Sequence, residues 1–336
     1  NCVMPHNHQH VLGSYHKAGP KEVQMAIDAS LNARKAWAEM PWEARVAVFK
    51  KMAALLQGPH RDIINAATML GQSKNAFQAE IDAACELIDF FNFNCEYVQQ
   101  IYAEQPPHSP DGMWNQVEYR GLEGFVFAVT PFNFTSIAAN LPTAPALMGN
   151  SVIWKPASSS VYSGYFLMKL FKEAGLPDGV INFVPGSGAQ VGDPVLESEH
   201  LAGIHFTGST AVFQGMWKKV GENIHNYKTY PRIVGETGGK DFILAHKSSD
   251  VKGLATAMVR GAYEYQGQKC SAASRCYIPQ NLWEDVKAEF LAQVATIKIG
   301  DVNDFSNFVN AVIDEAAFDS ISGYIDYAKN ADDAEI

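Results

Sequence analysis

The chain has 336 residues, of which 47% are hydrophobic and 18% charged, and its formal net charge is −10. This composition is typical of a soluble globular protein with more than one domain, and it excludes a fibrous or disordered chain. The acidic balance disfavours nucleic acid and anionic membrane surfaces as partners, because both select clustered lysine and arginine. No apolar run approaches the roughly 18 residues that a membrane-spanning helix needs.

Secondary-structure patterns predict a helical first part and an α/β remainder. Residues 20–102 repeat apolar side chains near the helical period, and a proline-rich break follows at 106–114. Residues 117–133 predict two short strands around a glycine turn. Further strands are expected, separated by helical segments, at 151–155, 180–184, 202–206 and 230–234. Strands that alternate with helices indicate a parallel sheet covered on both faces, so the predicted fold class is α/β.

The five cysteines are few, odd in number and irregularly spaced. A disulfide framework would be denser and even, so this pattern favours a reducing interior. Cys270 and Cys276 have no accompanying cysteine or histidine pair at ligand spacing, so no metal site is expected. The chain starts without an initiator methionine and stops in a charged helical stretch, and we therefore expect a fragment of a longer protein.

Two glycine-containing segments are candidates for a phosphate contact. GSGAQV (186–191) has Val191 where the third glycine of a dinucleotide fingerprint belongs, which favours an ordinary tight loop. FTGST (206–210) lies between a strand and an amphipathic helix. There Gly208 permits close backbone approach, and the first helical amides carry partial positive charge. A simple Ser or Thr N-cap is the alternative for this segment.

Polar side chains follow two strands of the predicted sheet. In TPFNF (130–134), Asn133 would bring an amide donor to the carboxyl edge, where open α/β sheets bind ligands. Its alternative role is to make a turn. IWKP (153–156) places Lys155 at the same edge, where a solvated lysine is the alternative.

Two later segments suggest a base and a nucleophile. GETGGK (235–240) starts a crowded glycine turn with Glu236, and a partly desolvated carboxylate there can act as a general base. GQKCS (267–271) places Lys269 before Cys270, and a nearby cation favours the nucleophilic thiolate. A buried, inert thiol is the alternative for Cys270.

Together these five motifs, in this order, resemble the aldehyde dehydrogenase superfamily over nearly the whole chain. Glu236 and Cys270 stand 34 residues apart (270 − 236), the usual separation in that family. Within the superfamily, the likeness is closest to the Δ1-pyrroline-5-carboxylate dehydrogenases. The segments that carry it are 71–94, 119–156, 198–209 and 263–272.

The resemblance implies a covalent mechanism with NAD as the cofactor. Cys270 would attack the aldehyde, Asn133 and the Cys270 N–H would stabilise the oxyanion, and Glu236 would activate water for thioester hydrolysis. NADP is possible too, because Ser158 stands where many NAD-preferring relatives have an acidic residue. The cofactor contacts carried over by motif are Thr130, Pro131, Phe132, Lys155, Gly208, Ser209, Thr210, Val212 and Gly238.

The implied reaction is the oxidation of L-glutamate γ-semialdehyde to L-glutamate in proline catabolism. Lys269, Ser271 and Phe134 match positions that line the substrate pocket. A charge-assisted contact with Lys269 would favour a carboxylate-bearing aldehyde by about 1.5–3 kcal/mol. Two alternatives stay open: an aldehyde dehydrogenase of another specificity, and a truncated, non-catalytic binding or assembly subunit.

Phe213 replaces a small family residue and indicates altered packing of its helix.

The resemblance also implies four segments in a Rossmann-like fold. They are a helical part of the cofactor domain (1–104), an oligomerisation or bridging hairpin (105–121), the NAD-binding core (122–238) and an incomplete catalytic domain (239–336). The full-length protein would act on a small-molecule substrate as a homodimer or higher homo-oligomer, and the fragment alone would be inactive. The family works in the bacterial cytoplasm and the mitochondrial matrix.

Overall fold

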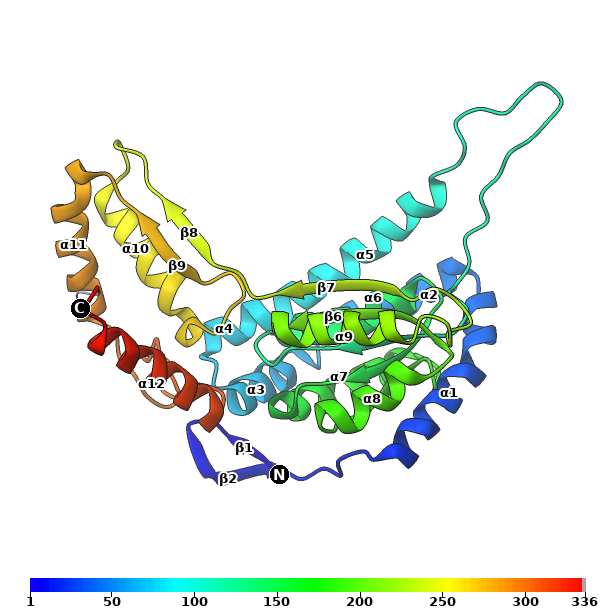
Figure 1. The fold of residues 1–336 in the computed structure, drawn as a ribbon, viewed down its shortest axis with the longest axis horizontal. Helices are drawn as coiled ribbons and strands as arrows, with labels where there is room; N and C mark the ends of the chain where they lie inside the picture. Colours follow the sequence, from blue (N-terminus) through cyan, green and yellow to red (C-terminus); the bar gives the residue numbers. More distant parts are fainter. Residues whose placement is uncertain (334–336) are drawn as a thin grey trace. The chain divides into compact units, whose positions relative to one another are not determined.

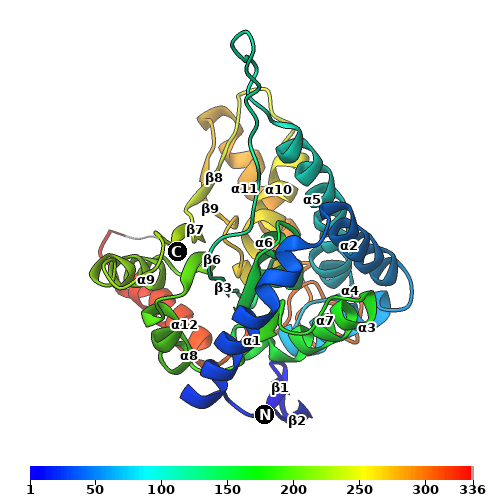
Figure 2. The same cartoon turned by 90° about the vertical axis from the view of Figure 1, so that its right-hand side faces the viewer.

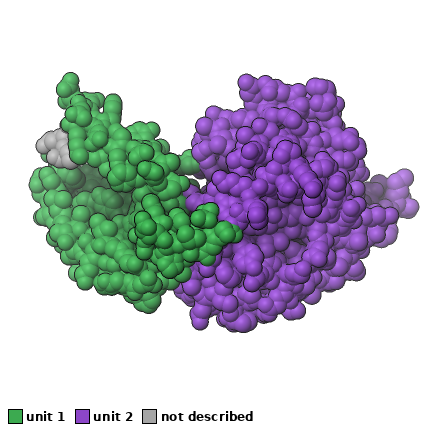
Figure 3. Space-filling view, turned by 90° about the horizontal axis from the view of Figure 1, so that it is seen from below, with its two compact units in different colours: residues 1–14, 68–79, 238–336 green, residues 15–67, 80–237 purple. Residues whose placement is uncertain are grey.

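The computed structural model describes residues 1–333 and separates them into two compact units (Figures 1 and 3). Unit 1 contains residues 1–14, 68–79 and the chain from Gly238 on. Unit 2 contains residues 15–67 and 80–237. Both units therefore join segments that are far apart in the sequence. Within residues 1–333, no helix is both long and apolar enough to span a membrane.

Unit 2 is built on an open parallel sheet of five strands in the order β5-β4-β3-β6-β7, which confirms the predicted α/β fold. The strands are β3 (Phe125–Val129), β4 (Ser151–Lys155), β5 (Ile181–Phe183), β6 (Leu201–Gly208) and β7 (Arg232–Thr237). The chain runs outward from β3 through β4 to β5 and then returns to place β6 on the other side of β3. Such a reversal is a switch point, where open α/β sheets leave a crevice outside the carboxyl ends of the strands.

Helices cover both faces of this sheet. They are α1 (Pro20–Glu39), α2 (Trp42–Gln57), α5 (Glu86–Ala103), α6 (Thr135–Leu147), α7 (Val161–Ala174), α8 (Gly188–Glu197) and α9 (Thr210–Glu222), with the short helices η1 (Glu80–Cys85) and η2 (Ser158–Ser160). Figure 2 shows α8 and α9 on one side of β6, and α2, α5 and α7 on the other.

The apolar strand β3 supplies side chains to the cores on both faces. Val126 and Ala128 belong to the cluster under α2, α5, α6 and α7, whereas Phe125 and Phe127 belong to the cluster under α1, α8 and α9. Successive side chains of a strand point to opposite faces, so an uninterrupted apolar run suits a strand that is buried on both.

Residues 104–124 form an extended arm without a helix or strand, which leads away from the end of α5 (Figures 1 and 2). The side-chain amide of Gln105 connects the outgoing and the returning segments of the arm. Its Oε1 accepts from Val117 N at 2.9 Å, and its Nε2 donates to Val117 O at 3.2 Å. The prediction of two strands around the glycine turn was therefore wrong for the first strand, because a side chain rather than a neighbouring strand meets Val117.

The described residues of unit 1 form two small sheets. β1 (Cys2–Met4) and β2 (Asn7–Gly13) form an antiparallel hairpin that the sequence pattern did not predict, and β8 (Asp241–Leu244) pairs in parallel with β9 (Ala273–Tyr277). Its helices are the last turn of α3 (Arg61–Gln72), α4 (Ala76–Ala79), α10 (Val251–Tyr263), η3 (Glu264–Gly267), α11 (Gln280–Val294) and α12 (Glu315–Asn330). Leu254, Met258 and Val286 form a core cluster between α10 and α11.

Candidate active site

The carboxyl edge of the unit 2 sheet gathers the segments that the sequence predicted to lie there. In the strand register, Val129 pairs with both Lys155 and Phe206. The loop of residues 130–134 continues from β3, and Ser209 with the first turn of α9 continues from β6, so the two segments leave the sheet on the two sides of its switch point. The predicted placement of residues 130–134 and of Lys155 at one edge is confirmed, and it is the position where sheets of this kind bind dinucleotides.

Two side chains at this edge already have partners within unit 2. Thr130 is buried, and its Oγ1 accepts a hydrogen bond from Nε1 of Trp154 at 2.9 Å. Lys155 is half-buried, and its Nζ donates to the carbonyl O of Pro156 at 3.0 Å. Burial lowers the pKa of Lys155. An ammonium carries three donors, so Lys155 can still donate to a hydroxyl or anionic ligand.

The rest of the loop leads directly into α6. Pro131, Phe132 and Asn133 are half-buried, and Phe134 is the buried N-cap residue of that helix. The start of α6 therefore keeps the Asn133 amide near the end of β3, where the sequence predicted an amide donor.

Both helix capping and aromatic packing shape the FTGST segment. Ser209 is the N-cap of α9, and its Oγ accepts from Val212 N at 3.4 Å, which is the capping role that the local sequence left open. A side chain at Gly208 would meet the Phe206 ring at 2.7 Å, so packing already requires glycine there. Thr210 and Val212 are exposed in the first turn of α9, which presents the positive end of the helix dipole to solvent.

Phe213 finds space because the neighbouring strand has a glycine. Its ring stacks on Phe206 with centroids 5.5 Å apart and meets Trp217 edge-on at 5.7 Å. A Cβ on Gly235 of β7 would lie only 2.3 Å from the Phe213 ring. Gly235 therefore serves the packing of α9, a role that the sequence motif did not reveal.

Glu236 stands on a strand rather than in the predicted glycine turn. It lies in β7 opposite Thr207 of β6 and is exposed in the structure. The prediction was wrong because β6 is long enough to continue the ladder as far as Gly208, which pairs with Thr237. β7 therefore ends at Thr237, and the two glycines of the motif follow it.

In unit 1, Cys270 is half-buried in a loop between η3 and β9. The residues before it form a left-handed turn, in which Tyr265, Gln266 and Gly267 have φ of 53°, 56° and 70°. Each non-glycine residue in this region costs about 1–2 kcal/mol, so contacts elsewhere must stabilise the turn. Tyr265 is fully buried, and its hydroxyl donates to the carbonyl O of Gln72 at 2.7 Å.

Lys269 belongs to a small charge cluster in unit 1. Its Nζ donates to Oε1 of Glu264 at 3.2 Å, and Arg260 donates to Oε2 of the same carboxylate at 3.1 Å. Burial alone would raise the pKa of Glu264, but Lys269 and Arg260 together outweigh it and hold that pKa below its ordinary value. The lysine before the candidate nucleophile is therefore oriented by a partner from the end of α10.

The glycines after β7 pass close to the cysteine loop. Asp241 of β8 pairs with Ala273 of β9, and a Cβ on Gly239 would lie 3.2 Å from the carbonyl O of Cys270. Glycine at 239 thus permits this close approach. A Cβ on Gly238 would meet no atom of the described chain within 4 Å.

The second cysteine of this region has a different environment. Cys276 is the fourth residue of β9 and packs against the core cluster of α10 and α11, and burial raises the pKa of its thiol. Cys270 and the exposed Ser271 lie instead in the loop. All five cysteines lie within the described residues, and none of them forms a disulfide.

Two other kinds of polar cluster were sought among the described residues, and neither makes a reactive site. Within residues 1–333, no three His, Cys, Asp or Glu side chains are placed to hold a metal ion. Nδ1 of His6 lies 3.2 Å from Oγ of Ser73, and Nε2 of His6 lies 3.7 Å from Oδ1 of Asp301. The three side chains thus stand in the order serine, histidine, aspartate of a hydrolytic triad. Because Ser73 is fully buried, a substrate cannot reach its hydroxyl.

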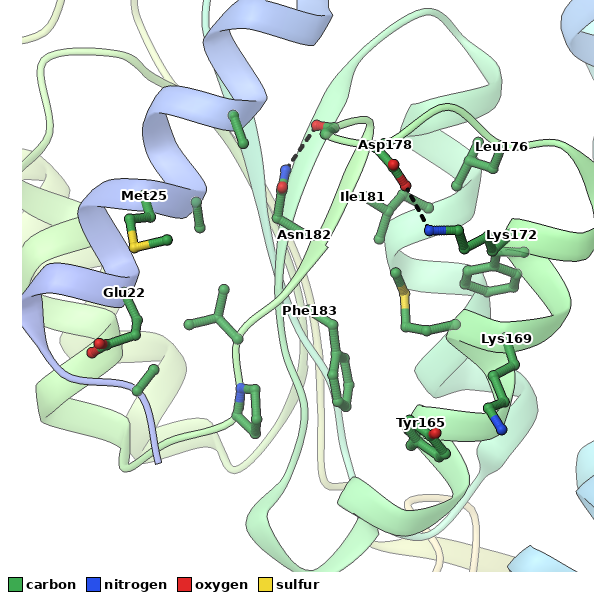
Figure 4. A pocket seen from close by; sticks show the side chains of 18 of the residues that line it. Glu22, Met25, Tyr165, Lys169, Lys172, Leu176, Asp178, Ile181, Asn182 and Phe183 are labelled. Atoms are coloured by element: carbon green, nitrogen blue, oxygen red, sulfur yellow. Dashed lines mark hydrogen bonds and ion pairs between the residues drawn. The ribbon is translucent and has the colours of Figure 1, made fainter. Parts of the chain in front are cut away.

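A cavity of about 1020 Å³ in unit 2 lies beside the edge strand β5, between α1 and α7 (Figure 4). Met25, Ile181 and Phe183 line it together with the Lys172–Asp178 ion pair, whose atoms are 3.5 Å apart. None of the site residues predicted from the sequence is among the residues that line this cavity.

Sequence reasoning missed the residues that surround the cysteine loop. Glu264, Gln266 and Gln268 precede Cys270 in EYQGQKC, and the side chain of each makes a hydrogen bond within unit 1. The sequence signal that could have indicated these residues is a glycine between two glutamines, directly before the candidate nucleophile and its lysine. Without their partners, however, these side chains look like solvated loop residues.

Comparison with known proteins gives a consistent result. The model of the Aldehyde dehydrogenase family matches residues 1–335. A delta-1-pyrroline-5-carboxylate dehydrogenase of Agaricus bisporus is 50% identical over 327 residues, which cover 97% of this chain and 60% of the relative. The mitochondrial delta-1-pyrroline-5-carboxylate dehydrogenase of Homo sapiens is 46% identical over 330 residues, which cover 98% of this chain and 58% of the relative. The chain thus spans about three fifths of the length of these curated relatives.

Solved structures agree with the sequence comparison. The Δ-pyrroline-5-carboxylate dehydrogenase of Mycobacterium tuberculosis bound with NAD has a TM-score of 0.96 and 52% identity, and the match covers 98% of this chain and 62% of that chain. A 1-pyrroline-5-carboxylate dehydrogenase from Thermus with bound NAD has a TM-score of 0.92 and 31% identity, with 98% and 63% covered.

Proposed function

The chain belongs to the aldehyde dehydrogenase family, and from that premise we propose that the full-length protein oxidises L-glutamate γ-semialdehyde to L-glutamate with NAD or NADP. The observation that carries the proposal is the register at the carboxyl edge of the unit 2 sheet, which puts residues 130–134 and 209–212 on the two sides of the switch point. The shared name of the relatives supports the substrate.

The residues at the switch point fit a dinucleotide. The exposed first turn of α9 offers amides and positive dipole charge to a pyrophosphate, beside the Ser209 hydroxyl. Lys155 offers a donor to a ribose hydroxyl, and Pro131 and Phe132 offer apolar surface to a nicotinamide ring. The proposed contacts are completed by Thr130, Gly208, Thr210, Val212 and Gly238.

Cys270 is the proposed nucleophile. Its thiolate sulfur forms a bond to the aldehyde carbon, and the carbonyl oxygen becomes an oxyanion, which the Asn133 amide and the Cys270 N–H stabilise. Held by the residues at the switch point, NAD or NADP would supply the hydride acceptor for this carbon, which would leave Cys270 carrying a thioester. Glu236 then takes a proton from water, whose oxygen displaces the thiolate and releases the carboxylic acid.

Substrate selection is proposed to depend on charge. Lys269 would bind the α-carboxylate of the semialdehyde, and Ser271 and Phe134 are the other proposed substrate contacts. The Glu264 carboxylate orients the ammonium in advance, because it holds Nζ at 3.2 Å. A pre-oriented donor loses less rotamer freedom when the substrate binds.

The proposal is tested with the purified full-length protein and pyrroline-5-carboxylate. Absorbance should show formation of NADH, Cys270→Ser should abolish it, and Cys276→Ser should keep most of it because that thiol lies in the core cluster. The proposal would be contradicted if the wild-type protein formed no NADH, or if the Cys270→Ser variant still formed it. Comparison of kcat/KM across aldehydes measures the specificity.

We also propose how the whole protein is organised. Residues 105–121 would mediate contacts in a homodimer or higher homo-oligomer, residues 1–104 and 122–238 would form the cofactor domain, and 239–336 would belong to the catalytic domain. We propose that the protein is intracellular and acts in the mitochondrial matrix or in the bacterial cytoplasm. The names of several relatives include the word mitochondrial, which supports this proposal. Light scattering of the full-length protein with and without the arm tests the assembly.

A further inference from the structure

The loop before Cys270 has a backbone conformation that its own residues disfavour. Tyr265, Gln266 and Gly267 are all in the left-handed region, although only Gly267 adopts it freely. An unsupported loop of this sequence would relax toward right-handed or extended backbone, and Cys270 would move with it. Such outliers persist where the surrounding structure over-determines them.

Gln266 supplies one of the contacts that hold this turn. Its Nε2 donates to the carbonyl O of Ala311 at 2.7 Å, and its Oε1 accepts from Asn310 N at 3.2 Å. The side-chain amide thus makes two bonds to neighbouring backbone groups, so it resists both displacement and rotation.

Gln268 makes a similar contact on the other side of Gly267. Its Oε1 accepts from the backbone N of Ile313 at 2.9 Å. The two glutamines that flank the glycine are therefore both fastened to one segment, residues 310–313, which we call the strap.

The strap is itself held firmly within unit 1. Asn310 is 4% exposed, and its Nδ2 donates to the carbonyl O of Gly300 at 2.8 Å. Just before it, Val309 forms a parallel bridge with Ile299. The strap is therefore a fixed support rather than a free loop.

A second support meets the turn through Tyr265. Its hydroxyl donates to Gln72, and the ammonium of the fully buried Lys74 lies 4.3 Å from the centre of its ring. With Tyr265 anchored on this side and the glutamines on the strap, the turn has contacts on both sides.

We propose that Gln266 and Gln268 are positioning residues, which fix the thiol and the backbone N–H of Cys270 for nucleophilic attack by fastening the left-handed turn to the strap. Neither side chain is required to touch the substrate. The kinetic consequence rests on the proposed function, whereas the structural consequence does not.

The test compares Gln266→Met, which keeps the length of the side chain but removes both hydrogen bonds, with Gln280→Met on the exposed first turn of α11. Gln266→Met should lower kcat by about 10- to 100-fold, because small misplacements of reacting groups are this costly. KM should change by less than about threefold, which separates a positioning role from lost substrate binding. Gln268→Met should act in the same direction and serves if the first variant folds poorly.

Hydrogen exchange supplies a readout that does not need the substrate. In Gln266→Met, amides of residues 264–272 and 308–313 should exchange faster, while those of β3 and β6 in unit 2 keep their wild-type rates. Unchanged exchange in the loop, or faster exchange with an unchanged kcat, would overturn the inference. If wild-type protein does not oxidise the semialdehyde, the proposed function fails, and loop exchange still decides whether the glutamines hold the turn.

Discussion

Lys269 and Glu264 form an ion pair in which Nζ and Oε1 lie 3.2 Å apart and both side chains are 17% exposed. Arg260 binds the second carboxylate oxygen of Glu264, so that one carboxylate is shared between two cations. Pairs at this depth are screened less by solvent than exposed pairs. The lysine next to Cys270 is therefore a fixed charge rather than a mobile one.

Replacing this lysine separates its two conceivable roles. Lys269→Met should raise KM for glutamate semialdehyde by about 10-fold or more, because a charge-assisted hydrogen bond to the substrate carboxylate is lost. The rate at which iodoacetamide alkylates Cys270 should change much less. If alkylation collapsed while KM held, Lys269 would be a thiolate activator instead of a carboxylate contact.

Replacing the carboxylate tests the pair itself. Glu264→Gln keeps the shape but removes the carboxylate charge that faces Lys269 and Arg260, and urea unfolding should show a loss of about 1–3 kcal/mol. Because the folded-state pKa of Glu264 is lowered, this stabilisation is present above its unfolded pKa and is lost as the pH falls through the folded value. Glu284→Gln on the surface of α11 is the matched control, and equal losses in the two variants would refute the pair's contribution.

The contact between Phe213 and Gly235 predicts a rescue experiment. Gly235→Ala places a methyl group where the Phe213 ring lies, and such overpacking should cost about 1–3 kcal/mol. A smaller side chain at 213 removes the clash. Gly235→Ala should therefore cost less free energy of unfolding in the Phe213→Ala background than in the wild-type protein. Thermal unfolding of the four proteins in this cycle gives the coupling, and strictly additive effects would argue against the contact.

Acid should destabilise the protein through His205. Its Nδ1 bonds the carbonyl O of Leu141 at 2.9 Å, and burial lowers its pKa more than this bond raises it. The unfolded state therefore binds the proton more readily than the folded state does. The free energy of unfolding is then highest above about pH 6.5, the ordinary pKa of histidine, and it decreases as the pH falls below that value, by at most about 1.4 kcal/mol per pH unit. Melting curves of wild type and His205→Gln should show a smaller pH dependence in the variant. An identical slope in both would mean that another group is responsible.

Local patterns in the sequence were enough to predict the α/β class of unit 2 and the edge of its sheet. The uninterrupted run FVFAV marks a strand buried on both faces, and the motifs that follow successive strands must then lie at one edge, since parallel strands all end there. The capping alternative for Ser209 was equally local, because it depends only on residues within one helical turn.

Contacts between distant residues lay beyond those patterns. The end of β7 depends on the length of β6 beside it, which is why Glu236 stands on a strand. Gln266 meets its partner 45 residues further along the chain, and Phe213 needs the space that Gly235 leaves. Periodicity and turn chemistry report the preferences of neighbours in sequence, whereas these side chains take their roles from atoms that only folding brings within hydrogen-bond or van der Waals distance.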